Sequence, residues 1–249
     1  MTFPNNPLET ALSLAATEPA ARPGFYRVLM ESDLFVIGRT DNPGEGSKTL
    51  PPGSTLAIAS MQDQEGKPFI PFFSSLEALG LVLNDEAGFV SMPARDLFEM
   101  TRGATLILNP GLDFGKEFFP NEIEALLATG LNHTTTERVV QQATNVMLGQ
   151  PANYPAGMVA SLSRLLVQHP CIAAAYLCLM QDADSDTPPV LVVGIEGDGD
   201  IAAAMREAGA VAADTAPRGE PVDFVVIERG TGGIGDYFVT SVEPFYQRA

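Results

Sequence analysis

The chain has 249 residues, of which 45% are hydrophobic, and it carries a formal net charge of −17 at pH 7. Residues 1–140 hold 9 basic and 18 acidic side chains, and residues 141–249 hold 5 and 13, so the two parts carry −9 and −8. Such an evenly acidic surface repels phosphate backbones and anionic lipids, so we expect neither nucleic-acid binding nor membrane association.

The amino-terminal residues give no sign of export. The segment Met1–Asn6 lacks the basic and apolar regions of a signal peptide. No apolar run approaches the ~20 residues that are needed to span a bilayer. These patterns predict a cytoplasmic protein.

The first half alternates predicted helices and strands. Asn6 is the expected cap of the first helix, because a proline follows it and Glu9 occupies the third helical position. Ser74 is the expected cap of the third helix, Met100 is expected to face inward from the fourth, and Gly130 should end the fifth. The predicted helices cover residues 7–15, 25–30, 74–79, 93–101 and 120–129, and the predicted strands cover residues 34–39, 55–61, 67–73 and 105–108, with a loop at 41–53.

The second half predicts the succession β-α-β-β-α-β. The predicted strands cover residues 138–148, 172–181, 190–196 and 222–228, and the predicted helices cover residues 156–169 and 201–211. Apolar residues recur from Met158 at i, i+4, i+7 and i+8, which is typical of a helix packed on a sheet. The succession resembles the split βαβ arrangement of ferredoxin-like domains. Residues 236–246 are expected to add one further strand.

Length and element order together predict two domains. Hydrophobic cores usually divide into units of ~100–150 residues, and a polar bridge at residues 132–137 separates the two runs of elements. We therefore predict an α/β (α+β) protein with two mixed-sheet domains, residues 1–137 and 138–249. The second domain should resemble a ferredoxin-like β-α-β-β-α-β arrangement.

Two segments imitate ligand-binding loops but lack essential positions. Gly230–Gly235 lacks the lysine and hydroxyl residue that end a Walker loop, and residues 237–241 read as a strand, where a dinucleotide loop requires a helix. Asp182–Asp186 imitates the start of an EF-hand, but Thr187 and Val193 occupy the positions of the required glycine and glutamate. We expect a flexible turn and a solvated hairpin connection at these places.

The histidines and cysteines form no recognisable catalytic or metal-binding set. His169 ends a predicted helix, where an imidazole meets the terminal carbonyls, and His133 is expected in a surface loop. Cys171 and Cys178 share one predicted strand, and their odd spacing puts them on opposite faces, so we expect no disulfide. The sequence therefore predicts no catalytic residue, no cofactor and no bound metal.

The remaining candidates are surfaces for a protein partner. The side chains of Phe69, Phe72 and Phe73 cannot all point to one face of a strand, so they are structural if both faces of the sheet are covered. If one face is open, they mark a partner surface. The turn that precedes residue 156 can present backbone donors and a tyrosine ring. The expected interaction residues are Gly149, Gln150, Tyr154, Phe72, Phe73 and Asn109.

Several segments carry a family resemblance. Residues 69–79 and 106–118 resemble the amino-terminal domain of the SseB family, which is named for enhanced serine sensitivity. Residues 148–155 and 243–246 resemble its carboxy-terminal domain. The resemblance covers most of the chain and keeps the order of the two domains. It implies no catalytic residues, and it brings a link to serine sensitivity and, in some bacteria, to a sulfurtransferase gene.

We therefore expect a non-enzymatic cytoplasmic protein that acts by binding a protein partner of unknown identity. The alternatives are an enzyme accessory factor in serine or sulfur metabolism and a small-ligand sensor. The reactivity of the cysteines tests the first alternative, and a ligand-induced rise in stability tests the second. An open sheet face would also allow a homodimer.

Overall fold

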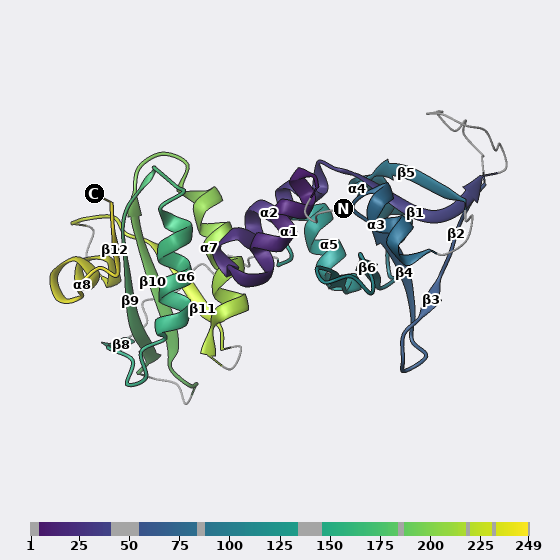
Figure 1. Cartoon of the computed structure of the whole chain (residues 1–249). Helices are drawn as coiled ribbons and strands as arrows, with labels where there is room; N and C mark the ends of the chain where they lie inside the picture. Colours follow the sequence, from purple (N-terminus) through teal and green to yellow (C-terminus); the bar gives the residue numbers. More distant parts are fainter. Residues whose placement is uncertain are drawn as a thin grey trace. The chain divides into compact units, whose positions relative to one another are not determined.

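The computed structural model describes residues 5–40, 55–83, 88–133, 146–183, 187–217, 220–230 and 233–248. The chain divides into two compact units, of which the first comprises Met1–Thr17 and Gly24–Asn132. The second comprises His133–Ala249 together with the short segment Glu18–Pro23. The predicted domain boundary between residues 137 and 138 lies outside the described residues and stays a prediction. Figure 1 shows the helices and strands of both units.

The first unit is a mixed sheet with helices. Its helices are α1 (Pro7–Thr17), α2 (Arg22–Met30, which begins in the second unit), α3 (Leu76–Val82), α4 (Ala94–Met100) and α5 (Pro120–Thr129). Its strands are β1 (Asp33–Thr40), β2 (Leu56–Ile58), β3 (Met61–Gln62), β4 (Pro68–Phe73), β5 (Phe89–Pro93), β6 (Leu106–Leu108) and β7 (Lys116–Phe118). The sheet order is β2-β1-β4-β6-β7, with β3 on β4 and β5 on β1. Among the described strands, β4 and β6 run parallel and the other pairs antiparallel.

Local signals place the first and last helices of this unit as predicted. Asn6 accepts a hydrogen bond from the backbone N–H of Glu9 through its side-chain oxygen, at 2.9 Å, and thereby caps α1. Helix α5 has the predicted bounds, and it ends at Gly130, which adopts the left-handed conformation with φ 77°. The connection between β3 and β4 also contains a glycine in the left-handed conformation, Gly66.

Other predictions for this unit were wrong in detail. Ser75, and not Ser74, caps α3, because its hydroxyl accepts from the N–H of Ala78 at 3.0 Å. Met100 is 55% exposed, although it was expected to face inward. The predicted strand at 55–61 divides into β2 and β3, which pair with different neighbours, β1 and β4. Strands β5 and β7 were not predicted, and the predicted loop at 41–53 lies outside the described residues.

The second unit is a mixed sheet covered on both faces. It contains β8 (Val146–Gly149), α6 (Ala156–Leu166), β9 (Ile172–Asp182), β10 (Val190–Gly197), α7 (Ile201–Thr215), β11 (Val222–Val226), α8 (Ile234–Ser241), β12 (Tyr246–Gln247) and a 3₁₀ turn at Pro19–Ala21. Leu162 of α6 and Ala208 of α7 pack with Val193 on one face of the sheet. Phe238 of α8 packs with Cys178 on the other. Figure 1 shows α6 and α7 lying along the sheet.

The order of the first six elements of this unit, from β8 to β11, is the predicted one, whereas the pairing is not that of a ferredoxin-like sheet. The sheet order is β11-β10-β9-β12, and β8 pairs with β9. In the split βαβ arrangement the first and third strands are neighbours. Here the third strand, β10, lies between β9 and β11, so it is not a neighbour of the first strand, β8. The general prediction of an α+β chain with two mixed sheets is confirmed.

The end of the chain corrects another prediction. Residues 236–246 were expected to form a strand, but Ile234–Ser241 is helix α8, and β12 is only the pair Tyr246–Gln247. The cause is tertiary packing. The ring of Phe238 lies so close to Gly194 of β10 that a Cβ there would stand 2.8 Å from it. The fully buried Phe238 thus holds α8 against the sheet.

Candidate functional site

The predicted interaction residues of the second unit lie on β8 and on the turn that follows it. Strand β8 pairs antiparallel with β9, with Leu148 opposite Met180 and Gly149 opposite Leu179. The turn leads into α6, whose first residue, Ala156, donates its N–H to the carbonyl of Tyr154 at 2.9 Å. The strand pairing and the start of α6 therefore fix both ends of this turn.

Apolar side chains on this stretch face solvent. Met147 is 55%, Tyr154 50% and Val146 40% exposed, and Gln150 is exposed as well. Partial burial raises the pKa of the Tyr154 hydroxyl above its usual value, so the ring is neutral at neutral pH. We call Val146, Met147, Gly149, Gln150 and Tyr154 the β8 surface.

Gly149 is not required by the conformation of this turn. It lies within β8, it is absent from the glycines with positive φ, and no atom lies within 4 Å of the position that a Cβ would take. Glycine therefore serves neither a left-handed turn nor a close backbone approach here. A side chain at this position would project from the β8 surface.

The predicted interaction residues of the first unit are buried, which corrects the expectation that they form a surface. Phe72, Phe73 and Asn109 have no exposed area. The ring of Phe72 meets those of Phe98 and Phe118 at centroid distances of 6.0 and 5.8 Å. Phe73 packs with α3 instead. Both faces of the sheet are therefore covered at this point, and the aromatic side chains are structural.

Asn109 belongs to a buried polar cluster that was not predicted. Its Oδ1 accepts from the N–H of Ser74 at 3.0 Å, and its Nδ2 donates to the hydroxyl of Ser74 at 2.9 Å. The hydroxyls of Ser74 and Ser75 both donate to Oε1 of the fully buried Glu9, at 2.8 Å each. The cluster thus joins α1 to the β4–α3 connection and to the turn after β6, and the last two lie within the segments that carry the family resemblance.

This cluster has the composition of a catalytic site but not its access. A carboxylate beside two hydroxyls could activate a nucleophile. However, Glu9, Ser74, Ser75 and Asn109 are all buried, and each hydroxyl donates to Glu9. Asn109 also adopts a positive φ of 50°, as expected of a turn residue whose side chain is held in place. We interpret the cluster as a set of structural contacts that holds the turn after β6 in place. The Asn-Pro-Gly turn signal in the sequence could have suggested this role for Asn109.

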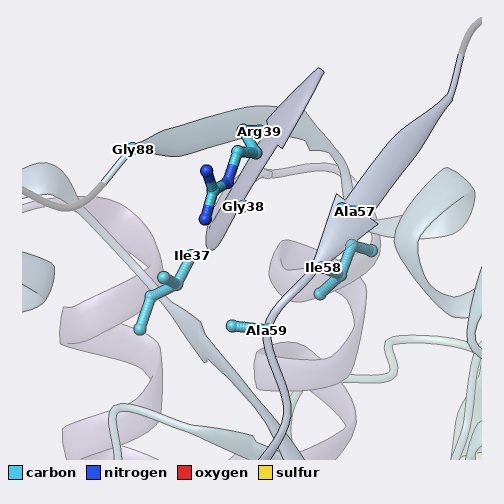
Figure 2. A pocket seen from close by; sticks show the side chains of 7 residues that line it. All are labelled: Ile37, Gly38, Arg39, Ala57, Ile58, Ala59 and Gly88. Atoms are coloured by element: carbon cyan, nitrogen blue, oxygen red, sulfur yellow. The ribbon is translucent and has the colours of Figure 1, made fainter. Parts of the chain in front are cut away.

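A shallow hollow of about 440 Å³ lies where β2 joins β1 (Figure 2). It is lined by Ile37, Gly38, Arg39, Ala57, Ile58, Ala59 and Gly88. Gly38 permits this pairing, because a Cβ there would lie 2.5 Å from the carbonyl oxygen of Ala57. Arg39 supplies the only charge among the described lining residues, so the described part of the hollow offers an apolar wall and a cation.

The cysteines and histidines do not assemble into a catalytic site among the described residues. Both cysteines are free, as predicted, and burial raises the pKa of the Cys178 thiol to about 11, which disfavours the reactive thiolate. The imidazole of His169 was expected to meet the terminal carbonyls of its helix. Instead it lies 3.0 Å from a carboxylate oxygen of Glu207. His133 is exposed, as expected, and contacts Asp214 at 3.4 Å.

The described parts of the glycine-rich segment and of the acidic loop show no ligand-binding feature. Helix α8, and not a strand, follows the glycine-rich segment, but the carboxylate of Asp236 accepts the N–H of Gly230 and so places a negative charge at this turn. The centre of the acidic loop, residues 184–186, lies outside the described residues. Within the described ranges no cluster of histidine, cysteine and carboxylate could hold a metal ion. Nor does any helix there have the length and apolar content needed to cross a membrane.

Comparison with known proteins covers both units. A family model of the SseB protein N-terminal domain matches residues 8–125, and a model of the SseB protein C-terminal domain matches residues 140–248. The chain is similar to two relatives named Protein SseB, from Escherichia coli (strain K12) and Shigella flexneri. Each is 39% identical over 248 residues, which cover 100% of this chain and 94% of the relative. No solved structure matches the chain.

Proposed function

The chain belongs to the SseB family, and we propose that it acts by binding a protein partner through the β8 surface and not by catalysis. The carrying observation is the exposure of Val146, Met147 and Tyr154 on one short stretch of the second unit. Exposed apolar side chains are typical of interaction sites, and a tyrosine adds a large rigid ring with a polar end. The buried positions of Phe72, Phe73 and Asn109 restrict the proposed surface to the second unit.

The chemistry of the described residues supports a binding role. Ser74 and Ser75 are enclosed with Glu9, and the thiol of Cys178 is buried and has a raised pKa. A substrate therefore has no accessible nucleophile at either place. The family's link to serine sensitivity and to sulfur transfer suggests where a partner should be sought, namely among proteins of serine or sulfur metabolism in the cytoplasm.

Site-specific photo-cross-linking tests this function. The variants Tyr154→p-benzoylphenylalanine and Val167→p-benzoylphenylalanine both carry the probe at an exposed position of the second unit, since Val167 is 70% exposed at the end of α6. We expect one reproducible protein adduct in native lysate with the probe at 154 and none with the probe at 167. Equal amounts of adduct from both positions, or no adduct from position 154, would contradict the proposal.

The hollow at Arg39 favours a second candidate, a small-ligand sensor. A cation beside apolar side chains suits a small carboxylate with an apolar group. Thermal-shift measurements with L-serine and simple carboxylates test it, because a specific ligand raises apparent stability. A shift that persists in Arg39→Gln would show that the ligand binds elsewhere.

A further inference from the structure

Strand β8 is an edge strand in the described part of the second unit. It pairs with β9 over four residues, from Val146 opposite Asp182 to Gly149 opposite Leu179. No described strand pairs with its other side. An edge of this kind presents alternate backbone N–H and C=O groups, which can pair with another extended chain.

The two edges of this sheet differ in their protection. Strand β11, at the opposite edge, contains Asp223 and has Glu220 and Glu228 close to its ends. Charges of this kind discourage the addition of a further strand. Strand β8 consists of Val-Met-Leu-Gly and has no charged residue. Its edge is therefore chemically suited to pairing, and the edge of β11 is not.

The charge around β8 selects the partner. The whole chain carries a formal net charge of −17. Asp182 stands opposite Val146 at one end of β8. A partner segment with basic residues would be attracted by this field, whereas a second copy of the chain would be repelled. Pairing of two copies along four residues of β8 would also bury far less than the ~800 Å² per partner that a stable dimer interface buries.

We propose that β8 is a strand-addition site for an extended segment of a partner protein that combines apolar and basic residues. The segment pairs with the free backbone edge of β8, its apolar side chains lie beside Val146 on one face of the sheet or beside Met147 on the other, and its basic residues are attracted by the acidic chain. This inference rests on the proposed function and adds to it the mode of binding and the class of partner.

The test uses the full chain and a peptide probe, Lys-Val-Thr-Val-Thr-Val-Lys with blocked ends. Titration into ¹⁵N-labelled protein should shift the amide signals of residues 146–149 saturably, and added salt should weaken binding. The same peptide with N-methyl groups on all five central residues has no backbone N–H donor there on either edge, so it should bind at least about tenfold more weakly. Equal binding of the two peptides would overturn strand addition.

Met147→Lys and Tyr154→Ser locate the site, and Val167→Lys is the control. Met147→Lys places a repelling charge on β8 and should weaken peptide binding about tenfold, whereas Val167→Lys, at an exposed position away from β8, should not. Tyr154 lies outside the strand, so Tyr154→Ser gives a second measurement of peptide binding if Met147→Lys disturbs the fold. A homodimer detected by sedimentation and lost in Met147→Lys would contradict the proposed partner. If the peptide fails while Tyr154 still gives its specific cross-link, strand addition is wrong and the proposed function stands.

Discussion

The side chain of Asn109 holds Ser74 at two points, through its Oδ1 on the backbone N–H at 3.0 Å and through its Nδ2 on the hydroxyl at 2.9 Å. The two residues are 35 positions apart, and both are buried. The backbone N–H of Asn109 also donates to the carbonyl of Phe72, at 2.8 Å. The turn after β6 is thereby fastened to the end of β4, which makes this contact a sensitive place for mutation.

Asn109→Ala should lower the free energy of unfolding by about 2–4 kcal/mol. It leaves the buried N–H of Ser74 without its acceptor and places a side chain without local hydrogen bonds at φ 50°. Asn109→Gly loses the same hydrogen bonds but tolerates the positive φ, so it should be about 1 kcal/mol less damaging. Urea unfolding measures both, with Asn153→Ala in an exposed turn as the control. Equal losses for the alanine and glycine variants would show that backbone strain plays no part.

Glu9→Gln should destabilise the first unit although it conserves shape. The carboxylate accepts three hydrogen bonds, from Ser74, Ser75 and the backbone N–H of Asn5. An amide nitrogen cannot accept, so at least one of these donors loses its partner, and we expect a loss of about 1–3 kcal/mol in urea unfolding. Glu77→Gln, on the exposed side of α3, is the control. A loss no greater than that of Glu77→Gln would contradict the structural role of the cluster.

Sequence reasoning succeeded where local interactions decide the structure. Helix α5 was predicted with its observed bounds because Pro120 and Gly130 mark its ends directly in the chain. Helix α8 was mistaken for a strand because its position depends on Phe238 meeting Gly194, 44 positions earlier. No local pattern records that contact.

The same distinction applies to the candidate site. Tyr154 could be predicted as exposed because it stands in a turn rich in glycine, proline and asparagine. For Phe72 and Phe73 the alternation of a strand left two alternatives open, since exposure depends on whether helices cover one face or both. Only the observed packing with Phe98 and with α3 decides between them.

Gly194→Ala should destabilise the second unit by about 1–3 kcal/mol through overpacking. The added methyl group would stand 2.8 Å from both Cδ1 of Ile227 and the ring of Phe238. Gly157→Ala is the matched control, because it lies in α6 with open space around it and should raise stability by about 0.5–1 kcal/mol. Urea unfolding should give opposite signs for the two variants. The same sign for both would contradict the packing of α8 on β10.

Glu196 should contribute to stability in a pH-dependent way. The hydrogen bond from Arg229, at 2.5 Å, lowers the pKa of the Glu196 carboxyl; burial opposes this, and a hydrogen bond from Tyr176 at 3.2 Å adds to the lowering. A carboxyl with a lowered folded-state pKa stabilises the fold above its unfolded pKa of about 4.3 and loses this effect as pH falls through the folded value.

Glu196→Gln should therefore be less stable than the parent chain at pH 7, and the difference should shrink as pH falls below about 4. Urea midpoints at a series of pH values measure it, and Glu243→Gln, on an exposed residue, is the control. A difference that stays constant down to pH 2.5 would show that the hydrogen bonds do not distinguish the two protonation states.

The two thiols should differ sharply toward a disulfide reagent in the native protein. Cys178 is fully buried, and its pKa of about 11 leaves about 0.1% thiolate at pH 8, whereas Cys171 is partly exposed. Native protein should thus show one fast-reacting thiol, which Cys171→Ser abolishes and Cys178→Ser retains. In denaturant both thiols should react. Fast native reaction of Cys178 would mean that the sheet opens or that the thiol is activated, and it would revive a catalytic role for this face of the second unit.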